Sequence, residues 1–586
     1  MILPLSKEKK DAIGEYLLPS FLTLVVFLTV LAVKKIFPFG GNTIDYYDMG
    51  QTNAPLYYHI WDVLHFKSDL FYTWYVNEGQ NLSMASAIQW NISVFNLFFL
   101  FIPRHLCFKA LGLFTGLRLF FMAFNMGIFL KKTMKAPAIY RMAMSLSYGL
   151  CGYVLTHYTI PPYLDTAALF PLYMLNLYYV LKEDEGIILW DFRISQRSLF
   201  ALSTGYMIAL SYYLSFMNLI FILLVSGTYI FVMAKKEDKI RISADVAISV
   251  ITGLLISSFM LLPAALQMTG SSRFNSNLSG SLFDNLKNIL FSVGADMYYI
   301  KWFILSGSVA AMVITVFGFV KIRKEKKTLL FVFLVCFYPC CLIPFESINL
   351  LWHMGTYYHY PIRCGYLIPF VILSAGAYFS GRLFTGEKPE LSVWEYIVFP
   401  ISCALIAGGV VIATVTIYKG RVWEIHELFR AWMVFALIMA LLYIVCIIIK
   451  RPMYISVFMA AELVCAAYVG FGCPNFRDVF SSEPEQSGEY INTINDLKRD
   501  MDIFESCTKR IKNPDTELNT KLRNGDKEGY GRRMGKYRQK GTARSIHGLW
   551  LQCSFYEDHG FRRYFVFGCH ASYYTDIDLC SRPLRK

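Results

Sequence analysis

Long apolar runs recur along most of the chain, and shorter polar stretches separate them. A helix of about 20 predominantly apolar residues is long enough to cross the hydrocarbon core of a bilayer. The pattern therefore predicts an all-α polytopic membrane protein, a bundle of about 13 transmembrane helices. The predicted spans lie near residues 16–34, 108–130, 141–158, 164–181, 199–214, 217–234, 245–264, 303–320, 328–345, 364–381, 395–417, 430–449 and 453–471.

The first polar region, residues 43–103, is a large loop rich in Tyr, Trp and Phe. Loops of this size in compact proteins are usually functional or disordered, and the many aromatic residues argue against disorder. The apolar run at 94–102 is too short to cross a bilayer alone, so we expect it to be re-entrant or interfacial.

Groups of Lys and Arg predict the orientation of the chain, because they all fall on one side when the predicted spans are counted. The positive-inside rule makes that side, with the N-terminus, cytoplasmic. The loops at 43–103, 265–302 and 346–363 and the C-terminus then lie outside, where we expect the active site. The basic groups are at residues 7–10, 131–141, 235–241, 321–327 and 450–451.

Composition and motifs exclude several classes of function. The net charge of +14 lies mostly in cytoplasmic loops, where anionic lipid headgroups account for it, so no nucleic-acid partner is predicted. The 14 Cys residues lack the spacing of a zinc site or a disulfide framework. No Walker loop, GxGxxG followed by a helix, or HExxH is present, which disfavours ATP-driven transport and zinc hydrolysis. No cleavable signal peptide is expected.

The transmembrane module is predicted to comprise residues 1–471, with its first outer loop at 38–103. Residues 472–520 are predicted to form an extracytoplasmic segment. Residues 521–586 form a basic tail that is too short to build a core of its own, so we expect it to be poorly ordered.

Asp45 and Asp48 follow the first predicted span directly, with Gln51 close behind and Trp74 further along the same loop. A carboxylate at this position can accept the proton of an attacking hydroxyl group, which makes Asp48 and Asp45 candidate catalytic residues. The alternative is that both are solvated loop acids. The two acids do not form an obvious metal cage, and no metal or other cofactor is predicted.

Two charged residues near or within predicted spans need partners. Asp165 follows two prolines at the outer mouth of a helical hairpin, where it either binds substrate or caps the next helix. Arg118 falls in the middle of a span, at a cost of about 2.5 kcal/mol or more if it is unpaired. A lipid phosphate or an intramembrane acid such as Glu462 could serve as its partner, and a structural role is the safer interpretation.

A second polar cluster, at residues 346–363, includes Trp352, His353, Tyr360 and Arg363. Arginine can bind a phosphate through two parallel hydrogen bonds, and histidine can act as a donor or proton source. An aromatic belt with one snorkelling arginine is the alternative. We favour substrate binding because so many such groups lie together on the same side as the acidic loop.

The order of these features resembles the YfhO-like bacterial membrane proteins, a branch of the GT-C glycosyltransferase superfamily. The resemblance covers roughly residues 10–475, and its most specific part is the Trp-His pair with the downstream Pro-x-Arg. Val94 stands where the family tends to have proline, and the tail lacks the further outer region and last span expected of the family, as a truncated end would. The matching segments are DMGQ (48–51), YTW (72–74), GQN (79–81), SVFN (93–96), the hairpin at 146–172, Asn349, WH (352–353) and YPIR (360–363).

The resemblance implies a GT-C-like membrane enzyme that takes a sugar from a polyprenyl-phosphate carrier. The acceptor would be a cell-envelope polymer such as lipoteichoic acid. A lipid-linked donor would also explain why no nucleotide-binding motif is present. The main alternative is a flippase or transporter of lipid-linked oligosaccharides, which is expected to have inverted repeats and broken helices. A structural scaffold for envelope assembly would not need the outer acidic and His/Arg clusters.

Overall fold

The structure is a computed structural model of the chain. It describes residues 7–41, 43–44, 54–68, 70, 72–73, 80–81, 92–182, 187–189, 192–269, 301–354, 362–384, 392–417, 427–472, 509–512, 550–558 and 562–570.

The described residues are almost entirely helical, and each predicted span contains a helix. The N-terminal half has α1 (Lys7–Val33), α2 (Ala54–Leu64), η2 (Val94–Phe101), η3 (Arg104–Leu106), α4 (Leu111–Thr133), α5 (Ala138–Gly149), α6 (Gly152–His157), α7 (Pro161–Lys182), α8 (Gln196–Leu210), α9 (Tyr212–Thr228), η4 (Tyr229–Met233), α10 (Lys239–Ile256) and α11 (Ser258–Thr269). The C-terminal half has α15 (Val309–Lys321), α16 (Lys326–Cys340), α17 (Glu346–Trp352), α18 (Leu367–Phe384), α19 (Val393–Ile417), α20 (Glu427–Ile448) and α21 (Met453–Gly472).

Short strands complete the described secondary structure. The strands form two two-stranded hairpins and one three-stranded sheet, and the latter includes part of the C-terminal tail. The strands are β1 (Tyr72–Thr73) with β2 (Gln80–Asn81), β3 (Ile187–Leu189) with β4 (Phe192–Ile194), and β5 (Lys509–Lys512), β6 (Trp550–Asp558) and β7 (Arg562–His570).

Seven helices in the described part of the chain are long and apolar enough to cross a membrane. An eighth results if α10 and α11, which are bent by 69° at their junction, form one broken span. The protein is therefore a multi-pass membrane protein, while the number of about 13 crossings stays a prediction. The run at 94–102 forms the short 3-10 helix η2 rather than a spanning helix, in agreement with its length.

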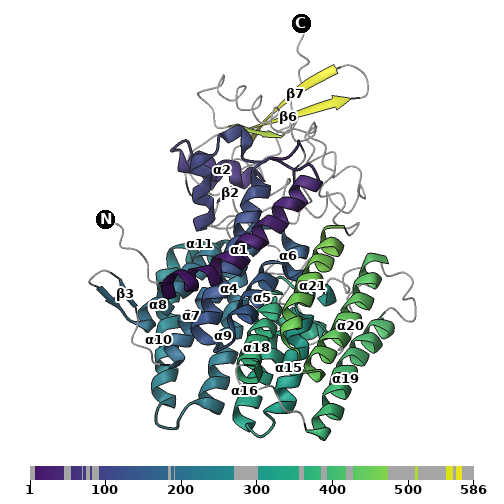
Figure 1. Cartoon of the computed structure of the whole chain (residues 1–586). Coiled ribbons are helices and arrows are strands. Elements are labelled where there is room, and N and C mark those ends of the chain that lie inside the picture. The colour runs from purple at the N-terminus through teal and green to yellow at the C-terminus, as the bar shows by residue number, and fades with distance from the viewer. Residues whose placement is uncertain are drawn as a thin grey trace.

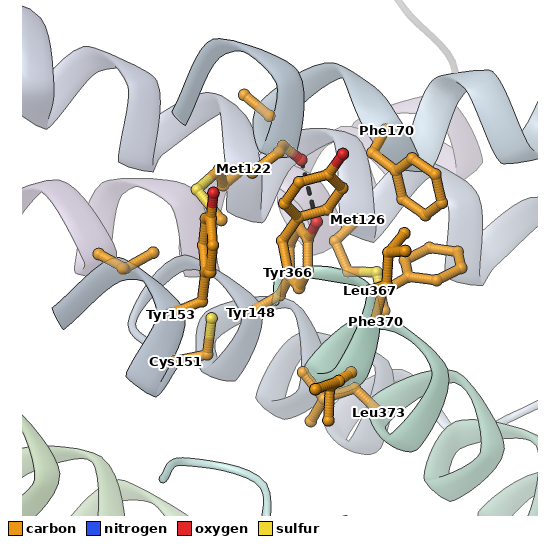
Figure 2. Close-up of a cluster of buried hydrophobic side chains, with 14 of the residues drawn as sticks. Met122, Met126, Tyr148, Cys151, Tyr153, Phe170, Tyr366, Leu367, Phe370 and Leu373 are labelled. Atoms are coloured by element: carbon orange, nitrogen blue, oxygen red, sulfur yellow. Dashed lines mark hydrogen bonds between the residues drawn. The ribbon is translucent and has the colours of Figure 1, made fainter. Parts of the chain in front are cut away.

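The helices form one bundle (Figure 1). Helix α4 is central, since it packs against α1, α5 and α7, and α18 joins this group through α5 and α15. Figure 2 shows a buried cluster in this region, where α4, α5, α7 and α18 meet. Its labelled residues include Met122 and Met126 from α4, Tyr148 from α5, Phe170 from α7, and Leu367, Phe370 and Leu373 from α18.

The described part of the predicted first outer loop forms a packed platform on one end of the bundle, made of α2, η2 and η3, which we call the outer-loop platform. The Nε1 of Trp61 in α2 donates to the carbonyl oxygen of Ile102 at 2.7 Å, and Asp62 binds Arg104 at 2.9 Å. In Figure 1 α2 lies at the same end of the molecule as strands β6 and β7. These helices are therefore fixed to each other by a charged pair and a partly buried hydrogen bond.

Several of the basic groups meet at a common end of the bundle. Glu15 of α1 binds both Lys131 at 3.1 Å and Arg141 at 2.6 Å. The hydroxyl of Tyr140, beside Arg141, donates to the carbonyl oxygen of Pro452 at 2.7 Å, which brings the group at 450–451 next to the one at 131–141. These contacts agree with a shared side, and its cytoplasmic identity stays a prediction.

Glu462 of α21 caps a different helix inside the bundle. Its two carboxylate oxygens accept from the backbone N–H groups of Val309 and Ala310, at 2.9 and 3.4 Å. The hydroxyl of Tyr443 donates to the same carboxylate at 2.8 Å. Because Ser308, the residue before α15, makes no side-chain cap, the distant acid takes over that role. Glu462 is therefore not the partner of Arg118.

We predict that Glu462→Leu lowers the free energy of unfolding by at least about 2 kcal/mol, because it leaves buried N–H and O–H groups without an acceptor. Glu462→Gln keeps one acceptor oxygen and should cost less. Thermal unfolding in detergent measures both, with Val464→Leu on the exposed face of α21 as the matched control. Equal stability of the Leu variant and the wild type would contradict the capping role.

Candidate functional site

Part of the predicted site lies outside the described residues. The candidate catalytic acids Asp45 and Asp48 belong to this part, so their role and any shared cavity with the other site residues stay predictions. The same holds for Gln51, Trp74 and Tyr360. The described residues contain the rest of the predicted site, and they divide it into two groups.

Asp165 belongs to the first group, as the partner of Arg118. It is the fifth residue of α7, which begins at Pro161, so the helix-cap interpretation is wrong. Its carboxylate accepts from the Nε of Arg118, and both side chains are buried. The expectation of an internal acid as a structural partner of Arg118 is therefore confirmed in kind, but the acid is Asp165 and not Glu462. The proposed binding of substrate by Asp165 stays a prediction.

The outer-loop platform covers this ion pair. Arg118 also donates from Nη1 to the carbonyl oxygen of Phe114 at 3.1 Å, and its guanidinium lies 5.4 Å from the ring centre of Phe95 in η2. The ring of Tyr57 in α2 stacks on Phe99 in η2 at 5.2 Å. The pair thus lies where α4, α7 and the first outer loop meet.

Arg363 is the centre of the second group, and contacts fix it at three points. Its backbone N–H donates to the Nε2 of His353 at 3.4 Å, and its carbonyl oxygen accepts from the hydroxyl of Tyr153 at 2.9 Å. Its guanidinium lies 5.2 Å from the ring centre of Tyr213. The structure therefore brings His353 and Arg363 together, as their shared cluster in the sequence predicts.

The hydrogen bonds of His353 determine its tautomer. Its Nδ1 lies 2.7 Å from the carbonyl oxygen of Asn349, which can only accept, so Nδ1 carries the proton. Its Nε2 accepts from Arg363 and is therefore unprotonated. Burial, opposed by the bond to Asn349 and supported by the positive charges of Arg363 and Lys301, lowers the pKa of His353 to about 3. A neutral His353 positions Arg363 and holds no spare proton near pH 7.

A buried ion pair adjoins this group, and the sequence reasoning missed it. The Nζ of Lys301 binds the carboxylate of Glu346, and the Nδ2 of Asn349 donates to the same carboxylate at 3.4 Å. Burial lowers the pKa of Lys301, although Glu346 opposes this shift. Glu346, Asn349 and His353 are spaced three and four residues apart, a periodicity that could have pointed to a common helical face.

His157 was also missed, because a histidine inside an apolar run usually belongs to the core. Its ring stacks on Tyr153 at 4.5 Å, and its Nδ1 lies 2.7 Å from the hydroxyl of Thr156. Through Tyr153, it adjoins Arg363. Trp352 is buried in the apolar core beside His353, and its proposed contact with substrate stays a prediction.

The described residues contain no group of three or more His, Cys, Asp or Glu side chains that could hold a metal ion. The second group instead offers a guanidinium and an amide beside a neutral imidazole whose two ring nitrogens are already hydrogen-bonded, which suits an anion with polar substituents.

We predict that His353 makes the stability of the fold depend on pH. Its pKa lies near 3 in the folded protein, against 6.5 for an unperturbed histidine, so the unfolded chain binds more protons between these values and stability falls as pH drops through this window. Between about pH 6.5 and 5 the loss is about 2 kcal/mol. His353→Gln does not titrate, so its melting temperature in detergent should fall less over this range. Parallel curves for both proteins would contradict the prediction.

The sequence matches a known protein family over most of its length. The model of the family described as "Bacterial membrane protein YfhO" matches residues 20–516, and none of the curated proteins matches the sequence. Among solved structures, ArnT from Cupriavidus metallidurans, determined with undecaprenyl phosphate, is 14% identical with a TM-score of 0.38, and the match covers 80% of this chain and 79% of ArnT.

The arabinofuranosyltransferase AftD from Mycobacteria is 15% identical with a TM-score of 0.37, and the match covers 69% of this chain but only 27% of AftD. Likenesses this distant establish no shared site residues. The family match, by contrast, extends over most of the chain, from the first helix past the last described one. The chain therefore belongs to the YfhO family of bacterial membrane proteins.

Proposed function

We propose that the protein is a membrane glycosyltransferase of the GT-C type. It takes a sugar from a polyprenyl-phosphate carrier and transfers it to an extracytoplasmic cell-envelope acceptor, such as a lipoteichoic-acid-like polymer. The observation that carries this proposal is the way Arg363 is held in place. Hydrogen bonds to His353 and Tyr153 hold its backbone, and its guanidinium lies over the ring of Tyr213. A fixed guanidinium is the group best suited to a phosphate whose charge increases during a reaction.

Arg363 binds the phosphate of the donor. When the bond between the anomeric carbon and the phosphate oxygen breaks, the polyprenyl phosphate leaves with the bonding electron pair and gains a negative charge. A guanidinium held in place stabilises this charge more as it develops, and so it lowers the barrier. His353 keeps the backbone of Arg363 in position.

Asp48 acts as the general base. The acceptor hydroxyl oxygen attacks the anomeric carbon, its proton passes to the carboxylate of Asp48, and a new glycosidic bond replaces the bond to phosphate. Asp45, three residues earlier, is the next candidate for this role. Gln51, Trp74, Asp165, Trp352 and Tyr360 are the further residues proposed to contact the donor or the acceptor.

A flippase for lipid-linked oligosaccharides is the second candidate function. Two breaks in the bundle favour it, since transporters often contain discontinuous helices. The predicted span at 141–158 is divided into α5 and α6, and α10 meets α11 at 69°. Such a protein would bind the same lipid phosphate but would release the sugar lipid intact.

We predict that Asp48→Asn lowers the rate of sugar transfer by about 100-fold or more, the usual contribution of a general base, while the protein still inserts and folds. The assay follows radiolabelled sugar from a polyprenyl-phosphate carrier to acceptor with purified protein in vesicles. Asp45→Asn serves as the matched variant. If Asp48→Asn transfers sugar at nearly the normal rate, Asp48 is not the base, and a large loss in Asp45→Asn would assign the role to Asp45.

We predict that Arg363→Lys impairs transfer, because lysine keeps the charge but loses the planar pair of donors. Arg363→Ala should be weaker still. Arg382→Lys is the control, since Arg382 makes its ion pair with Glu325 at the exposed end of α18. Normal transfer by both Arg363 variants, together with loss of movement of the intact lipid-linked sugar across the bilayer, would reject the transferase and favour the flippase.

A further inference from the structure

We propose that Asn349, held by the ion pair of Lys301 and Glu346, forms a subsite that binds a hydroxyl group of an uncharged sugar. This inference rests on the proposed function and deepens it, because it names the residues that would distinguish the sugar from its lipid phosphate. Asn349 contacts the sugar, and Lys301 and Glu346 are positioning residues.

The place of Asn349 in α17 fits a sugar attached to a phosphate at Arg363. Asn349 lies four residues before His353, which contacts the backbone of Arg363. Residues four apart in a helix lie on one face, about 6 Å apart along the axis. In a lipid-phosphate sugar the ring is bonded directly to the phosphate. A group one helical turn from the histidine that holds the backbone of Arg363 is therefore placed to contact the first ring.

The orientation of the Asn349 amide leaves an acceptor available. Its Nδ2 faces the carboxylate of Glu346 at 3.4 Å, and since a carboxylate only accepts, the amide nitrogen must point this way. Its Oδ1 is buried and makes no hydrogen bond to any residue that the structure describes. Buried polar atoms without a partner are rare and call for a physical reason. A hydroxyl group of a bound sugar would supply the missing donor.

The adjoining ion pair limits the kind of sugar. Lys301 and Glu346 are buried and bind each other, so together they carry no net charge. Transfer of a uronic acid or a protonated amino sugar to this region would bury a charge for which the described residues of the subsite hold no separate counter-charge. Hydroxyl groups carry no such cost. The subsite therefore favours an uncharged sugar.

The test measures binding of two lipids, undecaprenyl phosphate and undecaprenyl-phosphate glucose, to the full chain in nanodiscs. Asn349→Leu keeps the number and branching of the side-chain heavy atoms and removes the acceptor together with the amide donor. It should weaken binding of the glucose lipid about tenfold while binding of undecaprenyl phosphate stays within about twofold. Ser347→Ala, which removes a hydroxyl group from another face of α17, should change neither. Undecaprenyl-phosphate glucuronic acid should bind the wild type more weakly than the glucose lipid.

A second variant guards against a folding defect in the first. Lys301→Met with Glu346→Gln removes both charges together, so no buried charge is left unpaired. It frees Asn349 from the carboxylate and should reduce the preference for the glucose lipid over undecaprenyl phosphate. Loss of that preference in a protein that still binds undecaprenyl phosphate supports the subsite.

The remaining outcomes separate this inference from the proposed function. If the wild type binds neither lipid, the proposed function fails, and the subsite fails with it. If the wild type binds both and Asn349→Leu weakens neither, only the subsite is wrong. If Asn349→Leu weakens both lipids equally, the Asn349 side chain supports the phosphate site rather than the sugar, and the subsite is again wrong.

Discussion

The ion pair between Arg118 and Asp165 is the interaction on which the arrangement of the bundle depends. A charge buried among membrane helices needs an internal partner, because no water is available to solvate it. This pair joins α4, the helix with neighbours on several sides, to α7. Removal of either partner would leave a buried charge behind, at a cost of about 3–5 kcal/mol. The two helices are thereby held in one register.

The same pair connects the bundle to the first outer loop. Phe95 of η2 lies over the guanidinium of Arg118, and η2 is attached to α2 through the stacking of Tyr57 on Phe99. The bond between Asp62 and Arg104 then closes the platform. The candidate acids Asp45 and Asp48 directly precede α2 in the chain, so an enzyme built this way would carry its base on a loop anchored to a rigid bundle.

The requirement for internal partners also determines which residues around Arg363 are charged and which are neutral. Burial keeps His353 neutral, and its two ring nitrogens are used by Asn349 and Arg363. It therefore supplies no positive charge near pH 7. Lys301 is instead paired with the carboxylate of Glu346. Among the described residues of this group, Arg363 is thus the cation proposed to bind a phosphate, and the neutral polar groups beside it suit an uncharged substituent.

The sequence by itself determined the class of the fold, the helical segments, the inability of the run at 94–102 to span a bilayer, and the clustering of His353 with Arg363. These features follow from local hydrophobicity and short sequence separations. Tertiary structure decided which charged groups meet. Arg118 pairs with Asp165, an acid 47 residues away, and Glu462 caps a helix that begins more than 150 residues earlier. Such partners depend on which helices pack together and in which register. The hydrophobic pattern does not determine the packing or the register, because lipid-facing and buried apolar residues look alike in the sequence.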